Sequence, residues 1–143
     1  MRALTAILIA FVVAVPANGQ SFTVTFGSKH YATSESKNEA NPGAIVGTGV
    51  TEKIWGKAGI YENSEGKASV FLGGGYRLVF HEYFRAYVGM AAATGYGTLI
   101  HAPTLNTVGF FPTVSLEIGP KNYSLSLINM PGVVGFGVTM RLQ

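Results

Sequence analysis

Two polar side chains of this 143-residue sequence are of the types that carry out acyl transfer or ester hydrolysis: His30 and Ser64. An imidazole takes up and releases a proton near neutral pH, and a serine hydroxyl attacks or polarises an ester carbonyl. Exposed loops commonly contain histidine and serine, so the residue types alone are weak evidence. The hypothesis depends on whether the fold brings His30 and Ser64 together.

The composition of the chain excludes several classes of protein. Hydrophobic residues make up 48% of the sequence and charged residues only 12%, which is too apolar for a disordered chain. No cysteine is present, so disulfides and cysteine-ligated metals are excluded. The net charge of +3 comes from ten scattered Lys and Arg residues. With no run of basic residues, we expect no nucleic-acid partner.

The first nineteen residues have the pattern of a secretory signal peptide. Arg2 provides a positive start, residues 4–15 are apolar but too short to span a bilayer, and Pro16, Ala17 and Gly19 form a small-residue cleavage zone. A buried N-terminal helix is the alternative interpretation. The expected organisation is therefore a signal peptide over 1–19, exported by the Sec route, followed by one domain over 20–143.

The remaining chain has the two-residue hydrophobic period of β-strands. The alternation is clearest at 22–26, 108–118, 123–127 and 134–142. Four further segments fit the same pattern less cleanly, at about 43–51, 54–62, 68–79 and 83–94. The sequence therefore predicts eight strands and an all-β fold.

The connections between these strands alternate in length. Those near 51–53, 80–82 and 119–122 are short, whereas most of the others are longer and contain Pro, Gly, Asn and Ser. An even number of strands with short turns at one end and long loops at the other is typical of outer-membrane barrels. We therefore expect an eight-stranded antiparallel transmembrane β-barrel with up-and-down meander topology. It should lie as a monomer in a Gram-negative outer membrane with its longer loops outside.

A soluble eight-stranded barrel or a β-sandwich is the competing interpretation. Both would bury one apolar face of each strand, as the alternation requires. Neither explains why so few residues are charged, because a soluble surface normally carries about 25–35% charged residues. The composition therefore favours the membrane barrel.

The predicted topology separates the three histidines. His81 falls in a short periplasmic turn, where a solvated histidine is the simplest interpretation. His30 ends the first strand at the outer rim, and His101 lies in the third outer loop. Asn63 and Ser64 lie where the third strand enters the second outer loop. One imidazole and one serine hydroxyl thus fall at the same end of a narrow barrel.

Small residues at inward positions of the strands suggest a hollow lumen. An eight-stranded barrel is normally just filled by its side chains, so small residues leave a gap that can accept a hydrocarbon chain. The alternative is that the glycines relieve strain while Phe71 and Phe111 fill the space. The candidate acyl-chain pocket consists of Gly73, Gly75, Gly89, Ala91 and Gly109.

Several segments resemble, in chain order, the lipid A palmitoyltransferases (PagP), a family of eight-stranded outer-membrane enzymes. The segments are Lys29-His30-Tyr31, Asn38-Glu39-Ala40-Asn41-Pro42-Gly43, Ala58-Gly59-Ile60-Tyr61-Glu62-Asn63-Ser64, Gly73-Gly74-Gly75-Tyr76 and the closing Met140-Arg141-Leu142-Gln143. The family's catalytic histidine, aspartate and serine correspond to His30, Asn63 and Ser64. The resemblance therefore places an asparagine where the family has an aspartate.

The resemblance implies transfer of an acyl chain from a phospholipid to lipid A. In that scheme His30 acts as general base and then acid, Ser64 reacts or polarises, and Asn63 holds the tautomer of the imidazole. The expected partners are phospholipid and lipopolysaccharide in the membrane, with no cofactor and no metal. Two alternatives stay open: a non-catalytic structural or adhesive barrel, and a lipid esterase that hydrolyses instead of transferring.

Overall fold

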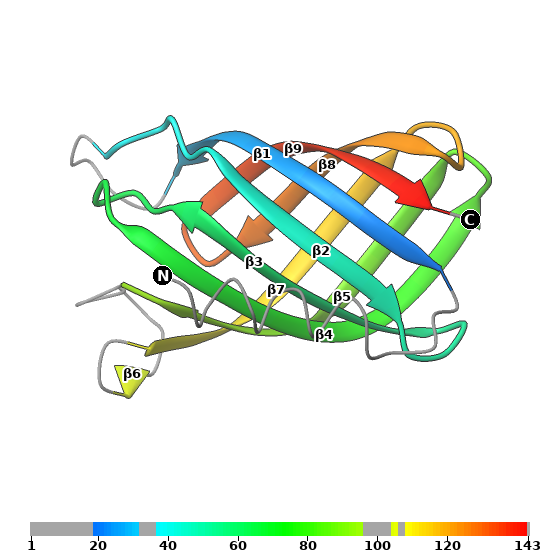
Figure 1. Cartoon of the computed structure of the whole chain (residues 1–143), viewed down its shortest axis with the longest axis horizontal. Helices are drawn as coiled ribbons and strands as arrows, with labels where there is room; N and C mark the ends of the chain where they lie inside the picture. The colour runs from blue at the N-terminus through cyan, green and yellow to red at the C-terminus, as the bar shows by residue number, and fades with distance from the viewer. Residues whose placement is uncertain (1–18, 32–36, 96–103, 106–107, 143) are drawn as a thin grey trace.

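The chain forms a closed antiparallel β-barrel (Figure 1). The computed structural model describes residues 19–31, 37–95, 104–105 and 108–142. Its strands are β1 (Gln20–His30), β2 (Gly43–Gly49), β3 (Ile54–Glu62), β4 (Ala68–His81), β5 (Phe84–Thr94), β6 (Thr104–Leu105), β7 (Val108–Ile118), β8 (Tyr123–Met130) and β9 (Val133–Leu142).

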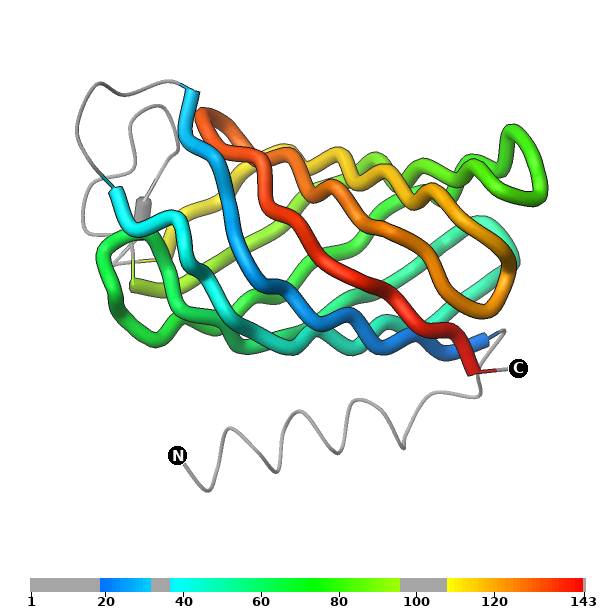
Figure 2. Tube along the Cα trace, turned by 90° about the horizontal axis from the view of Figure 1, so that it is seen from above, coloured from blue at the N-terminus to red at the C-terminus, as the bar shows by residue number. Residues whose placement is uncertain are grey.

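Each strand of the barrel pairs with its neighbours along the chain, and two further ladders complete the cylinder. β1 pairs with β9 over ten residue pairs from Gln20 to His30, and β5 pairs with β7 over its whole length. The tube view shows the strands tilted across the barrel (Figure 2). The prediction of an eight-stranded, antiparallel up-and-down barrel is confirmed, and the strand bounds lie within a few residues of those expected.

Two details differ from the sequence-based expectation. β6 is a ninth, two-residue strand that pairs with Val108 and Gly109 of β7, inside the segment that we expected to be an irregular loop. His81 is the last residue of β4 and pairs with Phe84 across the hairpin, so it closes a strand. In both cases a residue of a connection forms backbone pairs with a neighbouring strand. The two-residue hydrophobic period does not predict such short pairings.

The outward face of the barrel is an apolar wall. Alternate residues of β1 are exposed hydrophobics, and the same alternation continues around the barrel. Because a soluble protein rarely exposes a continuous apolar surface, this wall is suited to lipid contact. Its members include Phe22, Val24, Phe26, Ile60, Leu72, Val88, Met90, Phe110, Leu125 and Val138.

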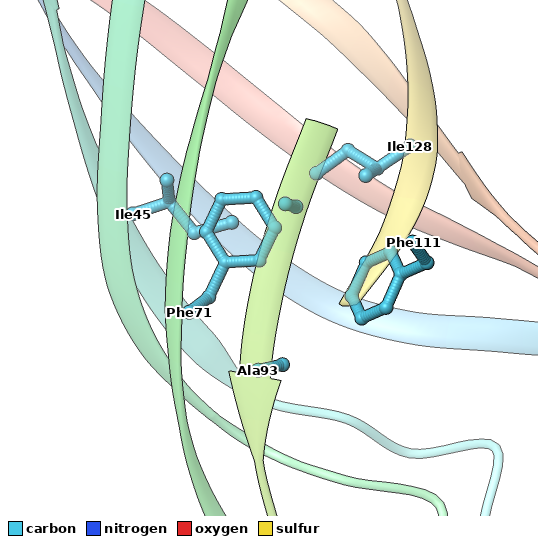
Figure 3. Packing of buried hydrophobic residues seen from close by; sticks show 6 residues of the cluster. Ile45, Phe71, Ala93, Phe111 and Ile128 are labelled. Carbon is cyan, nitrogen blue, oxygen red and sulfur yellow. The ribbon is translucent and has the colours of Figure 1, made fainter. Parts of the chain in front are cut away.

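The lumen is filled by two layers of side chains. The outer layer, which we call the apolar plug, lies beneath the long loops (Figure 3). The inner layer is polar, with Thr23 and Thr139 sharing a hydrogen bond at 2.6 Å between their hydroxyls. The plug consists of Ile45, Phe71, Ala91, Ala93, Phe111 and Ile128.

Glycines allow two strands of the barrel to approach closely. A Cβ on Gly75 would lie 2.3 Å from the carbonyl oxygen of Val88, and one on Gly89 would lie 2.0 Å from that of Gly74. No side chain fits at either position without moving backbone. These glycines are therefore required by the tight coiling of the β4–β5 pair.

The segment expected to be a signal peptide lies outside the described residues, apart from Gly19. The described part of the chain contains no helix that is long and apolar enough to cross a membrane. The chain enters β1 at Gln20, where the mature domain was expected to begin.

A charge placed on the apolar wall should destabilise the barrel. Val24 faces outward near the middle of β1, and we expect Val24→Arg to cost about 2–4 kcal/mol, the cost of arginine near the bilayer midplane. Tyr83→Arg in the exposed β4–β5 turn is the matched control and should cost under about 1 kcal/mol. Urea unfolding in phospholipid vesicles measures both. Equal costs for the two variants would contradict a lipid-facing wall.

Candidate functional site

The structure brings His30 and Ser64 into hydrogen-bond contact at the outer rim, the end of the barrel with the long loops. His30 is the last residue of β1, and Ser64 follows β3 by two residues. The distance between Nε2 of His30 and Oγ of Ser64 is 2.7 Å. A base and a hydroxyl at this separation satisfy the geometric requirement for proton transfer between them.

The surroundings of His30 favour its neutral form. Burial lowers the pKa of the imidazole below its usual value, the Glu39 carboxylate partly opposes this shift, and Lys37 and Lys29 add to it. Nδ1 is buried and has no hydrogen-bond partner in the part of the chain that the structure describes. A neutral imidazole accepts a proton through one ring nitrogen, so His30 can act as a base toward Ser64 near neutral pH.

Asn63 has a different role from the one expected of it. Its Oδ1 accepts hydrogen bonds at 2.9 Å from the backbone N–H groups of Glu65 and Lys67. Its Nδ2 donates at 3.0 Å to the hydroxyl of Ser69 and to the carbonyl oxygen of Gly95. All four bonding positions of this fully buried amide are thus occupied.

These contacts leave nothing in Asn63 to orient the imidazole of His30. The expectation drawn from chain position is therefore corrected: Asn63 builds the turn that presents Ser64 and ties it to the next outer connection. The conformation of the local turn decides where the side chain next to Ser64 points. Here the turn directs the side chain of Asn63 into the loop and away from His30.

Asn38 and Glu39, in the described part of the first outer loop, are hydrogen-bonded to the Ser64 turn and to β1. The backbone N–H of Asn38 donates to the carbonyl oxygen of Ser64 at 3.1 Å, and its side chain donates to the Glu62 carboxylate at 2.8 Å. On the other side, the N–H of Ser28 donates to the carbonyl oxygen of Glu39 at 2.8 Å. Asn38 and Glu39 therefore join β1 to β3 across the rim, a role that the sequence analysis did not predict.

The predicted acyl-chain residues line or surround a small space. A cavity of about 30 Å³ is lined by Gly73, Gly75 and Gly89, together with Trp55 and Tyr87. Since about 10–15 Å³ suffices to hold one water molecule, this space is far too small for an acyl chain. The methyl of Ala91 is buried in the apolar plug, and Gly109 opposes Ala93 across the β5–β7 ladder. Phe71 and Phe111 occupy the lumen beside them, as the alternative interpretation proposed.

Of the other two histidines, His81 lies far from this site. The ring of His81 stacks on Tyr83 with centroids 5.7 Å apart, at the opposite end of the barrel. His101 lies outside the described residues. Within the described ranges, no group of three or more His, Cys, Asp or Glu side chains is placed to hold a metal ion.

Comparison with known proteins supports the fold. No protein-family model matches the sequence, and no curated protein shows significant similarity to it. Among solved structures, the outer membrane protein Ail of Yersinia pestis, determined in a phospholipid bilayer nanodisc, matches with a TM-score of 0.51 at 10% identity. The match covers 87% of this chain and 99% of that one. The chain therefore has the fold of an outer-membrane barrel, and the sequence comparisons do not support the lipid A palmitoyltransferase family specifically.

The charge balance around His30 gives a prediction with a definite sign. Glu39 is the group that raises the pKa of His30, so Glu39→Gln should lower that pKa further. The change also frees Lys29, whose ammonium lies 2.8 Å from the Glu39 carboxylate. Titration of the imidazole signals by NMR in micelles, assigned with His30→Gln, measures the shift. A higher pKa in Glu39→Gln would contradict this account.

Asn63 should be intolerant of a carboxylate. In Asn63→Asp an oxygen replaces the Nδ2 that donates to Gly95 and Ser69, leaving acceptors facing each other in a buried site. We expect a loss of about 1–3 kcal/mol in the free energy of unfolding. Asn129→Asp is the control, because Oδ1 of the exposed Asn129 only accepts from Tyr31. A neutral or stabilising Asn63→Asp would restore the expectation that this residue faces His30.

Proposed function

We propose that this chain is an outer-membrane barrel that modifies ester lipids, with His30 and Ser64 as its reacting pair. The observation that carries the proposal is the 2.7 Å contact between Nε2 and Oγ at one rim of a lipid-facing barrel. The fold similarity to an outer-membrane barrel supports that location, and the rim with the long loops would face the outer leaflet.

The reaction follows from the pair. His30 Nε2 takes the proton of Ser64 as Oγ attacks the ester carbonyl, and the protonated imidazole then gives that proton to the departing alkoxide. The acyl group is left on Ser64. An acceptor hydroxyl, deprotonated by His30, then takes the acyl group and frees the serine. Transfer to lipid A and transfer to water differ only in which hydroxyl enters at this second step.

Among the described residues, no third member fixes the imidazole. Nδ1 of His30 has no hydrogen-bond partner, and the amide of Asn63 is fully engaged elsewhere. In serine hydrolases the group on Nδ1 holds the tautomer, and replacing it lowers kcat about 10⁴-fold. A His–Ser pair of this kind is therefore expected to react slowly. A slow reaction is compatible with a lipid substrate, because the membrane keeps the substrate at the site.

The acyl chain of the substrate does not need a hollow lumen in this proposal. The apolar plug fills the space beneath the rim, whereas Phe26 lies on the lipid-facing side of β1 only four residues before His30. A lipid lying along this outer wall would bring its ester toward the rim while its chain stays in the bilayer. Recognition of chain length would then be weak.

A non-catalytic barrel is the second candidate, and the unpartnered Nδ1 favours it. In that case the His30–Ser64 bond would only fasten the second outer loop to β1. The two candidates differ in whether lipid composition depends on the imidazole.

Removing either member of the pair should abolish lipid modification without unfolding the barrel. His30→Ala and Ser64→Ala are each expected to lower the rate by about 10²–10⁴-fold, because each removes the proton-transfer step. Ser28→Ala is the matched control: its hydroxyl lies at the same rim but bonds Asn41 and not His30. Mass spectrometry of phospholipids and lipid A from cells expressing each variant measures the products, and heat-modifiable gel mobility verifies folding.

Identical lipid profiles for the wild-type protein and His30→Ala, with both folded, would contradict the enzyme and leave the structural barrel. New lysophospholipid together with acylated lipid A in the wild-type profile would indicate transfer. Lysophospholipid and free fatty acid alone would indicate hydrolysis.

A further inference from the structure

The inner half of the lumen contains more positive than negative charge. Glu117 is 1% exposed, and three cations surround its carboxylate. We call Lys57, Arg85 and Arg141, together with Glu117, the basic cluster. With three cations and one carboxylate its net charge is +2. Charges buried in this way are costly unless they are paired.

Backbone carbonyls satisfy part of the arginine charge. Arg85 donates to the carbonyl oxygens of Glu82, Gly119 and Pro120 at 2.8–3.1 Å, and Arg141 donates to that of Lys121 at 3.0 Å. The Nε groups of both arginines are nevertheless buried, with no hydrogen-bond partner within the described ranges. The carbonyl dipoles thus stabilise the positive charge of the two arginines, but their Nε–H groups are left without an acceptor.

Lys57 is the least compensated member of the cluster. Its Nζ lies 3.6 Å from Oε1 of Glu117, beyond ordinary hydrogen-bond distance, and 4.0 Å from the centre of the Tyr87 ring. Tyr87 meanwhile donates its hydroxyl to Oε2 of Glu117 at 3.1 Å. The carboxylate is therefore shared among several donors, and the ammonium of Lys57 retains N–H groups for another acceptor.

A cavity lies next to this ammonium. Its volume is about 30 Å³, and its lining includes Lys57, Trp55, Tyr87, Thr113 and Ser115. The indole N–H of Trp55 is buried with no hydrogen-bond partner among the described residues. Its N–H and the ammonium of Lys57 are donors, whereas the hydroxyl of Thr113 already donates to the carbonyl oxygen of Asn129 at 3.2 Å. Glycines and Phe71 form much of the rest of the lining, and the space admits a water molecule or a monatomic anion.

We propose that this cavity is a binding site for a small inorganic anion of halide size, held by Lys57 within the basic cluster. The anion neutralises part of the net +2 charge and accepts hydrogen bonds from the ammonium of Lys57 and the indole N–H of Trp55. A water molecule fits by size but leaves the charge uncompensated, so the field of the cluster selects an anion. The site is independent of the His30–Ser64 pair, which lies at the outer rim.

The single tryptophan of the chain reports on this site directly, because Trp55 lines the cavity. Bromide quenches indole fluorescence on contact through its heavy-atom effect. The full chain folded in nonionic micelles is titrated with sodium bromide, with sodium gluconate keeping the ionic strength constant. We expect a saturable loss of Trp55 emission that chloride reverses and gluconate, which is too large for the cavity, does not.

The variant Lys57→Met should abolish the saturable loss, whereas Lys53→Met, at an exposed turn lysine, should retain it. Weak quenching that rises linearly with bromide concentration and is not reversed by chloride would overturn the proposal. Such quenching would show that bromide collides with Trp55 but does not bind beside it. Saturable quenching that is the same in Lys57→Met and in the wild type would also overturn it. If Lys57→Met does not fold, the competition between bromide, chloride and gluconate in the wild-type protein decides alone.

Discussion

The closed hydrogen-bond ladder is the constraint on which the rest of this structure depends. A lipid environment offers no partner to a backbone N–H or C=O, so a spanning sheet must have no free edges. The β1–β9 and β5–β7 ladders remove those edges. Closure fixes which side chains face lipid, which fill the lumen, and which connections gather at each rim. His30 and Ser64 meet because the antiparallel pairing of β1 with β2 and of β2 with β3 brings the ends of β1 and β3 to the same rim.

The lumen shows how a narrow barrel divides its interior between two kinds of packing. The apolar plug seals the outer half beneath the His30–Ser64 pair, and the basic cluster occupies the inner half. Small residues at inward positions allow neighbouring strands to approach closely and make room for the rings of Phe71 and Phe111. They therefore do not leave an empty channel. The chemistry at the rim is thereby isolated from the charge below it.

The strand pattern and the location of the His30–Ser64 pair were predictable because both follow from local periodicity and loop length. Alternation of apolar and small or polar residues identified the strands, and loop lengths placed His30 and Ser64 at one rim. The role of Asn63 was not predictable, since it depends on the distant partners Ser69 and Gly95. The basic cluster was also missed, because Lys57, Arg85, Glu117 and Arg141 come from four strands and no local spacing relates them.

The central claim is that His30 activates Ser64 as a nucleophile, and covalent labelling tests it most directly. The full chain in bilayers is treated with a lipophilic fluorophosphonate, and the adduct is located by intact and peptide mass spectrometry. A single adduct on Ser64 that disappears in folded His30→Ala is the predicted result. Absence of an adduct on Ser64, or labelling that is unchanged in His30→Ala, would contradict the account.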